Sequence, residues 1–369
     1  MGISPRTISV RSQFIRGLTA SDSPRRQCQF HLAFQWICGD VSVNDHTLSD
    51  FSVDHAEVLD RLLTQQIAQL MFVGAVTLER VAQDGVRVRA SAGTSSFRRK
   101  PTLEECLVAA EAQVTSLPEE VRNDPGAATR REQAARVRAA REREQRVRDA
   151  LEACAEVHAA KEKRGRGSLK QPARGSTTDP DARKRKMPDG GTRPAFNVPF
   201  ATDAVSPVIV GVDASNAGND HGQLGPMSQQ IESRTGQRPE AHLADGGFAS
   251  DEDLEDLNDP GDGPKIDLPV RDAQKKRTQG LDPFAPLPGD SPARAEWRQR
   301  LGTDTAQAID KQRASTAECV NALARQRGLT QFRVRGLPKA KIIATWFALA
   351  HNVLRWAFFQ TLPRLANSR

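Results

Sequence analysis

Three acidic residues stand out because of the sequence patterns around them. Asp84 lies beside a stretch of alternating apolar and polar residues, Asp245 follows the short apolar run Leu243–Ala244, and Glu318 lies in a long helical pattern. Their carboxylates are hard oxygen ligands of the kind that Mg²⁺ prefers. Two such ions, about 4 Å apart, can activate an attacking oxygen and stabilise a leaving one in phosphodiester chemistry. Because the chain has 46 acidic residues, residue type alone indicates such a site only weakly.

Each of the two aspartates also has a simpler interpretation. Both are followed by glycine, and Asp-Gly is one of the commonest turn dipeptides. Asp84 alone would fit a hairpin turn between two short strands, and Asp245 a turn before an acidic helix. Asp203 and Asp213, in nearby apolar stretches, compete with Asp84 for the first place in a metal site.

The elements that would position these acids follow an α/β order. Val86 and Val88 alternate with Arg87 and Arg89, which predicts a half-buried strand within Leu78–Ala92. The later patterns predict a hairpin of strands at 195–202 and 208–214, and two further short strands at 243–244 and 266–270. They also predict three helices, at 222–235, 305–327 and 340–362. A loop is expected over 271–295 and a short strand at 331–335. This order suits a ribonuclease-H-like mixed sheet flanked by helices.

The N-terminal third adds helices to this plan. Residues 1–30 show no sustained period and are expected to be loose and basic, whereas 30–38 and 54–72 have helical spacing. Val58, Leu62 or Leu63, Ile67 and Leu70 form the expected apolar face of the second helix.

Residues 101–165 are expected to be helical, with a break at Asn123–Gly126. Eight arginines lie between Arg130 and Arg148, and the thin apolar line beside them could seam a helical hairpin. Such a charge run is usually a solvated helix face. An arginine-rich arm that grips phosphates is the alternative, and its candidate contacts are Arg136, Arg138 and Arg141. Asp179 and Asp181 fit turn and capping roles.

Composition favours a soluble protein with a polyanionic partner. The formal net charge is +7, which is most simply matched by nucleic acid. Five scattered cysteines without a Cys-x-x-Cys pair argue against a disulfide framework or a zinc site and favour a reducing cytoplasm. The longest apolar run, Ile342–Ala350, is too short to span a bilayer, so no membrane is expected.

Seven short stretches between Trp36 and Trp356 together resemble the DDE transposases of bacterial insertion sequences, which have a ribonuclease-H-like catalytic domain. These stretches are Val81–Ala92, Ser176–Ala182, Phe196–Asp203, Leu243–Ala249, Arg313–Ala322, Gln331–Gly336 and Ala348–Asn352. The resemblance implies that Asp84, Asp245 and Glu318 are the catalytic, metal-binding triad, with Mg²⁺ or Mn²⁺ as cofactor. Asp84 is preferred to Asp203 because the match around it is longest.

The resemblance also implies the division of the chain. Residues 1–75 would be a partial helical DNA-binding region, 76–100 the first part of the catalytic domain, 101–174 a charged helical insertion, and 175–369 the rest of that domain with a C-terminal helix. Arg313 and Arg325 match the arginine and basic positions that accompany the glutamate, and are expected to contact DNA. The implied partner is double-stranded DNA, both element ends and target, bound by a homodimer in the bacterial cytoplasm, at the nucleoid.

Two departures from the family pattern motivate other hypotheses. The chain has no tyrosine, and Asp310 stands where the family has one; only Phe30–Leu70 matches the longer N-terminal domain of relatives. A truncated transposase is therefore expected, and the alternative function is an inactive remnant that only binds DNA. A third hypothesis is a helical scaffold protein whose charged arm pairs with another chain.

Overall fold

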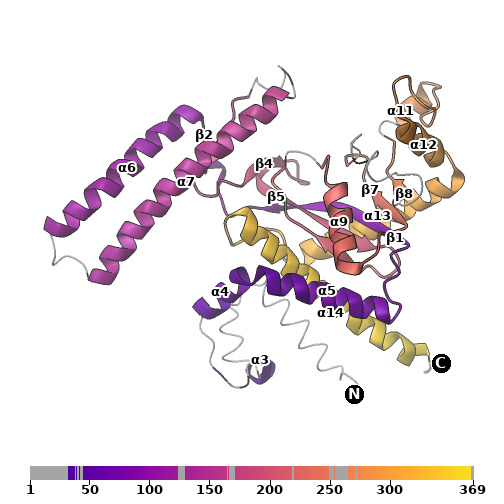
Figure 1. Cartoon of the computed structure of the whole chain (residues 1–369), viewed down its shortest axis with the longest axis horizontal. Helices are drawn as coiled ribbons and strands as arrows, with labels where there is room; N and C mark the ends of the chain where they lie inside the picture. Colours follow the sequence, from indigo (N-terminus) through magenta and orange to yellow (C-terminus); the bar gives the residue numbers. More distant parts are fainter. Residues whose placement is uncertain are drawn as a thin grey trace. The chain divides into compact units, whose positions relative to one another are not determined.

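The chain divides into two compact units. The computed structural model describes residues 32–37, 39, 41, 45–123, 129–163, 165, 171–217, 220–248, 253, 265–270 and 273–366 (Figure 1). The first unit draws on Met1–Val86, Asn197–Thr330 and Lys341–Arg369. The second comprises Arg87–Phe196 and Gln331–Ala340. The expected loose segment 1–30 and most of the expected acidic helix 251–257 lie outside the described residues.

A mixed β-sheet is the main β structure among the described residues, and it confirms the expected α/β class. Its strands are β1 (Arg80–Arg89), β4 (Arg183–Lys186), β5 (Thr192–Asp203), β6 (Ile209–Val212), β7 (Ala241–Ala244) and β8 (Lys265–Asp267). They run in the order β4-β5-β1-β7-β8, with β6 paired to β5. The pairs β1/β7 and β7/β8 are parallel, whereas β4/β5 and β5/β6 are antiparallel. The hairpin of β5 and β6 confirms the prediction for that region.

Strand β1 corrects one expectation. It runs without a break through Asp84 and Gly85, so these two residues do not form a hairpin turn. The cause is long-range packing. A Cβ on Gly85 would lie 2.6 Å from the side chain of Asn197 on β5, so the position accepts only glycine unless Asn197 moves. The glycine serves a close approach between strands.

Helices surround the sheet residues of the first unit. They are α3 (Leu32–Ile37), α4 (Asp45–Asp54), α5 (Ala56–Phe72), α9 (Leu224–Thr235), α11 (Ala273–Thr278), α12 (Pro292–Leu301), α13 (Asp304–Gln326) and α14 (Leu337–Ala366), the last beginning in the second unit. In α5 the fully buried residues are Leu59, Leu63, Ile67 and Leu70. The expected apolar face is thus right for Leu63, Ile67 and Leu70 but not for Val58 or Leu62, which are exposed.

Two predictions in the later part of the chain are wrong in detail. The expected loop 271–295 contains α11 and the start of α12, whose N-cap Ser291 accepts a hydrogen bond from Arg294 N and is followed by Pro292. The expected strand at 331–335 is reduced to a single bridge between Gln331 and Arg89.

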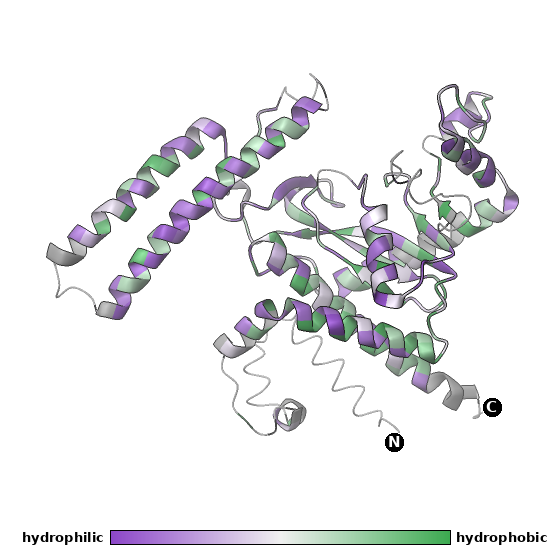
Figure 2. Cartoon of the chain, in the orientation of Figure 1, coloured by the Kyte–Doolittle hydropathy of each residue, from purple (hydrophilic) through white to green (hydrophobic). Residues whose placement is uncertain are grey.

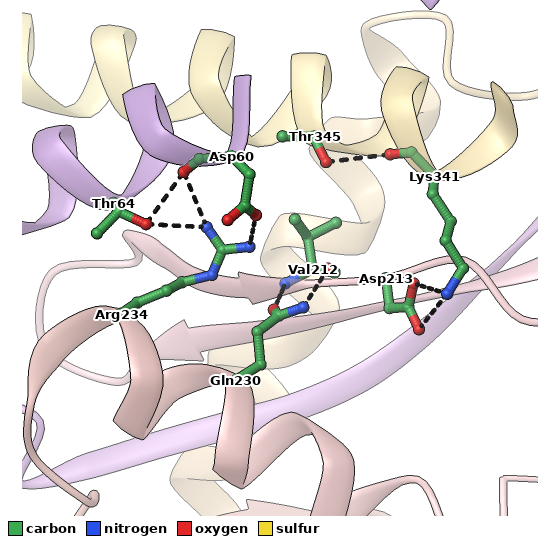
Figure 3. A network of polar contacts seen from close by, with 8 residues as sticks. All are labelled: Asp60, Thr64, Val212, Asp213, Gln230, Arg234, Lys341 and Thr345. Carbon is green, nitrogen blue, oxygen red and sulfur yellow. Dashed lines mark hydrogen bonds and ion pairs between the residues drawn. The ribbon is translucent and has the colours of Figure 1, made fainter. Parts of the chain in front are cut away.

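Polar contacts connect α5 with α9, α9 with β6, and α14 with the residue that follows β6 (Figure 3). The Arg234 guanidinium on α9 forms an ion pair with Asp60 on α5. Gln230 on α9 accepts from Val212 N at 2.8 Å and donates to Val212 O at 3.1 Å, so its side chain continues the edge of β6. Lys341 at the start of α14 forms an ion pair of 2.8 Å with Asp213, just after β6. These contacts fix the side of the sheet away from its parallel strands.

Helix α14 contains the only described segment, Leu337–Gln360, long and apolar enough to cross a membrane. Within it Ala344, Ala348, His351 and Asn352 are fully buried. Asn352 bonds both N and O of Ile209 on β6, and His351 Nε2 donates to Pro207 O at 2.7 Å. These bonds hold the buried face of this part of α14 against β6 and the loop before it.

The second unit contains a long helical hairpin of α6 (Lys100–Asn123) and α7 (Arg130–Lys163), as predicted (Figure 1). Hydrophobic and hydrophilic residues are mixed along both helices, and α7 is the more hydrophilic (Figure 2). Leu103, Ala150, Cys154 and Ala173 form a small core between them, and Ala110, Ala140 and Val147 are also buried. Farther along, Arg148 joins Glu111 and Glu144 in ion pairs of 2.6 and 2.7 Å. At the base, β2 (Phe97–Arg98) pairs antiparallel with β3 (Gly175–Ser176).

Candidate functional site

Two of the predicted acids occupy neighbouring positions on adjacent parallel segments. Strands β1 and β7 are parallel, and Gln83 on β1 is the register partner of Ala244, the last residue of β7. The next residue in each segment is an acid: Asp84 within β1 and Asp245 directly after β7. Neighbouring strands lie about 5 Å apart, so the register brings the backbones of the two acids close together. In open α/β sheets ligands bind beyond the carboxyl ends of the strands, and Asp245 lies at such an end.

Both carboxylates are held by the glycine that follows them. Gly85 N donates to Asp84 Oδ1 and Gly246 N donates to Asp245 Oδ1, each at 2.7 Å. Phe248 N also donates to the carbonyl oxygen of Asp245 at 2.9 Å, which closes a turn after β7. The turn expected at Asp245 is therefore present, and it leaves the Asp245 side chain exposed, whereas Asp84 is half-buried.

Glu318 lies on α13, which packs against β7 in the first unit. Three residues later on the same face of the helix, Asn321 Nδ2 donates to Asp84 Oδ2 at 2.7 Å. The helix therefore brings the turn that carries Glu318 to Asp84, but Glu318 itself is exposed. Among the residues that the structure describes, no three His, Cys, Asp or Glu side chains lie close enough together to hold a metal ion.

The chemistry of this edge suits a hard cation. Asp84 and Asp245 offer carboxylate oxygens from adjacent strands, the ligand type that Mg²⁺ and Mn²⁺ accept. A third carboxylate would have to come from Glu318 by a movement of its side chain or helix. The residues of this site could therefore bind a metal ion through the carboxylates of Asp84 and Asp245.

The competing aspartates have other roles. Asp203 is fully buried and accepts hydrogen bonds from Thr77 N and Leu78 N on Oδ2, and from Val205 N, Ser206 N and Ser206 Oγ on Oδ1. Its carboxylate ties the loop after β5 to the segment before β1. Asp213 forms the ion pair with Lys341 (Figure 3). Of the acids weighed for the first place, Asp84 is the one that lies on the strand paired with β7, next to Asp245.

A buried pair below the two acids was not foreseen from the sequence. His242 on β7 is fully buried, and its Nε2 lies 2.9 Å from Oε1 of Gln83 on β1. Burial lowers the pKa of His242 to about 4, so the ring is neutral at pH 7 and donates through Nε2. Gln83 in turn donates from Nε2 to Gln223 O at 3.2 Å. This chain of bonds fixes the two strands against each other directly before Asp84.

The predicted DNA-contacting arginines fall in different places. Arg325 on α13 is exposed, whereas the side chain of Arg313 lies outside the described part of the chain. Arg136, Arg138 and Arg141 are exposed on α7, in the second unit, and form no ion pair with a described residue. Asp179 and Asp181 cap the start of α14, as predicted: Asp179 Oδ1 accepts from Gly336 N, and Asp181 Oδ2 from Leu337 N.

Comparison with known proteins adds no relative: no protein-family model, curated protein or solved structure matches the chain.

Proposed function

We propose that this chain is a DDE-type insertion-sequence transposase with a ribonuclease-H-like catalytic domain. It hydrolyses phosphodiester bonds at the ends of its element and joins the freed 3′-hydroxyl groups to target DNA. The observation that carries the proposal is the position of Asp84, within β1, beside Asp245, at the carboxyl end of the neighbouring parallel strand β7. The sequence resemblance, which rests on the same residues, supports the reaction class.

In this proposal Asp84, Asp245 and Glu318 hold Mg²⁺ or Mn²⁺. The bound ions would stabilise charge on the attacking and leaving oxygens. The backbone amides of Gly85 and Gly246 keep the two aspartates oriented before DNA arrives. Such orientation is favourable because a ligand set that is already in place loses less freedom on binding. Glu318 joins the two aspartates from α13 when DNA and metal are bound.

The exposed arginines supply the grip on DNA. Arg136, Arg138 and Arg141 are exposed along one helix, and Arg325 is exposed on the helix that carries Glu318; Arg313, the other proposed contact, belongs to that same helix. Contacts with phosphates are independent of base sequence and position the duplex. We further propose that the protein acts as a homodimer on DNA in the bacterial cytoplasm, since two element ends must be joined in one event.

The second candidate is a catalytically inactive protein that only binds DNA. Two observations favour it: the chain has no tyrosine, and the described residues contain no cluster of three metal ligands. The same arginines would bind DNA, and the aspartates would have no catalytic role.

Cleavage of DNA that carries the element's own ends separates the two candidates. With Mg²⁺, the wild-type chain is expected to nick at these ends, while Asp84→Ala, Asp245→Ala and Glu318→Ala each abolish nicking and still bind. Asp213→Ala is the matched control, because this acid pairs with Lys341 and lies outside the site. Binding without nicking by the wild type would favour the inactive candidate. Undiminished nicking in all three variants would exclude the proposed site.

A further inference from the structure

We infer that Asn321 is a positioning residue of this site: it fixes the Asp84 carboxylate, and its free amide oxygen accepts a hydrogen bond from water or substrate bound beside Asp84. The inference rests on the proposed function, because it concerns the same acid. It adds Asn321 to the three proposed carboxylate ligands and assigns it two tasks: to orient Asp84 and to hydrogen-bond the water or substrate bound there.

The first observation is the contact itself. Asn321 is 4% exposed, and its Nδ2 donates to Asp84 Oδ2 at 2.7 Å across 237 residues of sequence. Gly85 N donates to the other oxygen, Asp84 Oδ1, at the same distance. With a donor on each oxygen, the carboxylate cannot rotate without losing a bond. Asn321 therefore sets the plane in which Asp84 presents its remaining lone pairs.

The second observation is the other end of the same amide. Asn321 Oδ1 is buried and has no hydrogen-bond partner among the residues that the structure describes. Buried polar atoms are nearly always paired, and an unpaired one carries a desolvation cost of about 1–3 kcal/mol. The oxygen belongs to the group that touches Asp84, so a water or ligand at this carboxylate is within reach of it.

Asn352 shows what a purely structural asparagine looks like in this fold. It is also fully buried, yet both ends of its amide are paired: Oδ1 accepts from Ile209 N at 2.9 Å, and Nδ2 donates to Ile209 O at 2.8 Å. Asn321 pairs only its donor end. This difference separates a residue that completes a core from one that leaves an acceptor for a ligand.

The position of Asn321 on α13 also links two of the proposed ligands. Glu318 lies three residues earlier, on the same helix face. The bond to Asp84 thus anchors the turn of α13 that carries Glu318 to the middle of β1. If α13 shifts so that Glu318 can join the site, Asn321 shifts with it, and the hydrogen bond from Asn321 transmits that movement to the Asp84 carboxylate.

Mn²⁺ binding to the full-length, chelator-treated protein, measured by titration calorimetry, tests the inference. The variants are Asn321→Leu, which keeps the branched shape and removes both polar atoms, and Asn321→Ala. Each is expected to weaken Mn²⁺ binding by about 10-fold or more, the usual effect of losing a partner that orients a metal ligand. The control Asn352→Leu should lower the melting temperature and leave Mn²⁺ affinity unchanged.

The outcomes separate this inference from the proposed function. If the wild type binds Mn²⁺ and both Asn321 variants bind it equally well, Asn321 has no positioning role, and the proposed function stands. If Asn352→Leu weakens binding as much as the Asn321 variants, the effect is general damage and the inference is overturned. If the wild type binds no Mn²⁺, the proposed metal-dependent function fails, and this inference with it.

Discussion

His242 on β7 donates a buried hydrogen bond of 2.9 Å to Gln83 on β1, immediately below the two candidate acids. Gln83 directly precedes Asp84, and His242 precedes Asp245 by three residues. A slip of one residue between the strands would break this bond and move one acid away from the other. The pair therefore fixes the register that places Asp84 beside Asp245.

A double-mutant cycle tests this coupling. Gln83→Leu leaves the His242 Nε2–H buried without its acceptor, and should lower the free energy of unfolding by about 1–3 kcal/mol. His242→Phe should cost a similar amount, because it leaves Gln83 Oε1 buried without its donor while Gln83 Nε2 keeps its bond to Gln223 O. In the double variant both polar groups are gone, so the cost should fall short of the sum by about 1 kcal/mol or more. Denaturant unfolding measures all three, and Gln326→Leu, at an exposed position, is the control. Strictly additive costs would contradict the coupling.

The burial of Asp179 gives a pH dependence with a definite sign. Burial, opposed by the hydrogen bond from the Gly336 amide and aided by the nearby Asp181, raises the pKa of this carboxyl to about 6. Between pH 4 and 6 the folded chain holds a proton that the unfolded chain has lost. The contribution of this group to stability is therefore complete below pH 4 and is lost as the pH rises through 6.

Asp179→Asn should remove that loss. The variant should gain stability over the wild type at pH 8, by at most about 3 kcal/mol, and gain little at pH 4. Melting temperatures at the two pH values measure the difference. Glu152→Gln, at an exposed position on α7, is the control for loss of one negative charge. A difference in melting temperature that does not change with pH would show that Asp179 is ionised in the fold throughout.

The arginines of α7 should determine how DNA binding depends on salt. Replacing Arg136, Arg138 and Arg141 together with alanine should weaken binding to any duplex. The slope of log K against log salt concentration should fall by up to about 0.9 for each phosphate that the variant no longer neutralises. Fluorescence anisotropy between about 50 and 200 mM salt measures it. Arg148→Ala is the matched control, because this arginine is engaged with Glu111 and Glu144. An unchanged slope in the triple variant would show that these three arginines form a solvated helix face and do not contact DNA.

The sequence was sufficient for the elements whose signal is local. The alternation Val86-Arg87-Val88-Arg89 predicted the outer half of β1, and the charge pattern predicted both helices of the hairpin. What it could not supply was pairing at long range. The Asp-Gly dipeptide at 84–85 has the local signature of a turn, and only β7 and Asn197 hold it in a strand. The capping pattern Ser291-Pro292 could have identified α12.

The candidate site was predictable to a similar extent. Asp245 follows an apolar run, so its place at a strand end could be read from the sequence, and Asp84 was chosen by resemblance. The roles of Asn321 and His242 depend on hydrogen bonds across 237 and 159 residues of chain, which no local pattern encodes. Asp203 remained a competitor in sequence because its five donors become visible only when the loop after β5 is folded.

The most direct test of the central claim is to locate a bound divalent ion on the chain. Fe²⁺ can replace Mg²⁺ at oxygen sites, and with ascorbate and peroxide it cuts the nearby backbone. The claim predicts cuts within a few residues of Asp84 and Asp245, suppressed by excess Mg²⁺ and absent in Asp84→Asn and Asp245→Asn. Cuts elsewhere, or cuts near these two aspartates that persist in both variants, would contradict a metal site formed by Asp84 and Asp245.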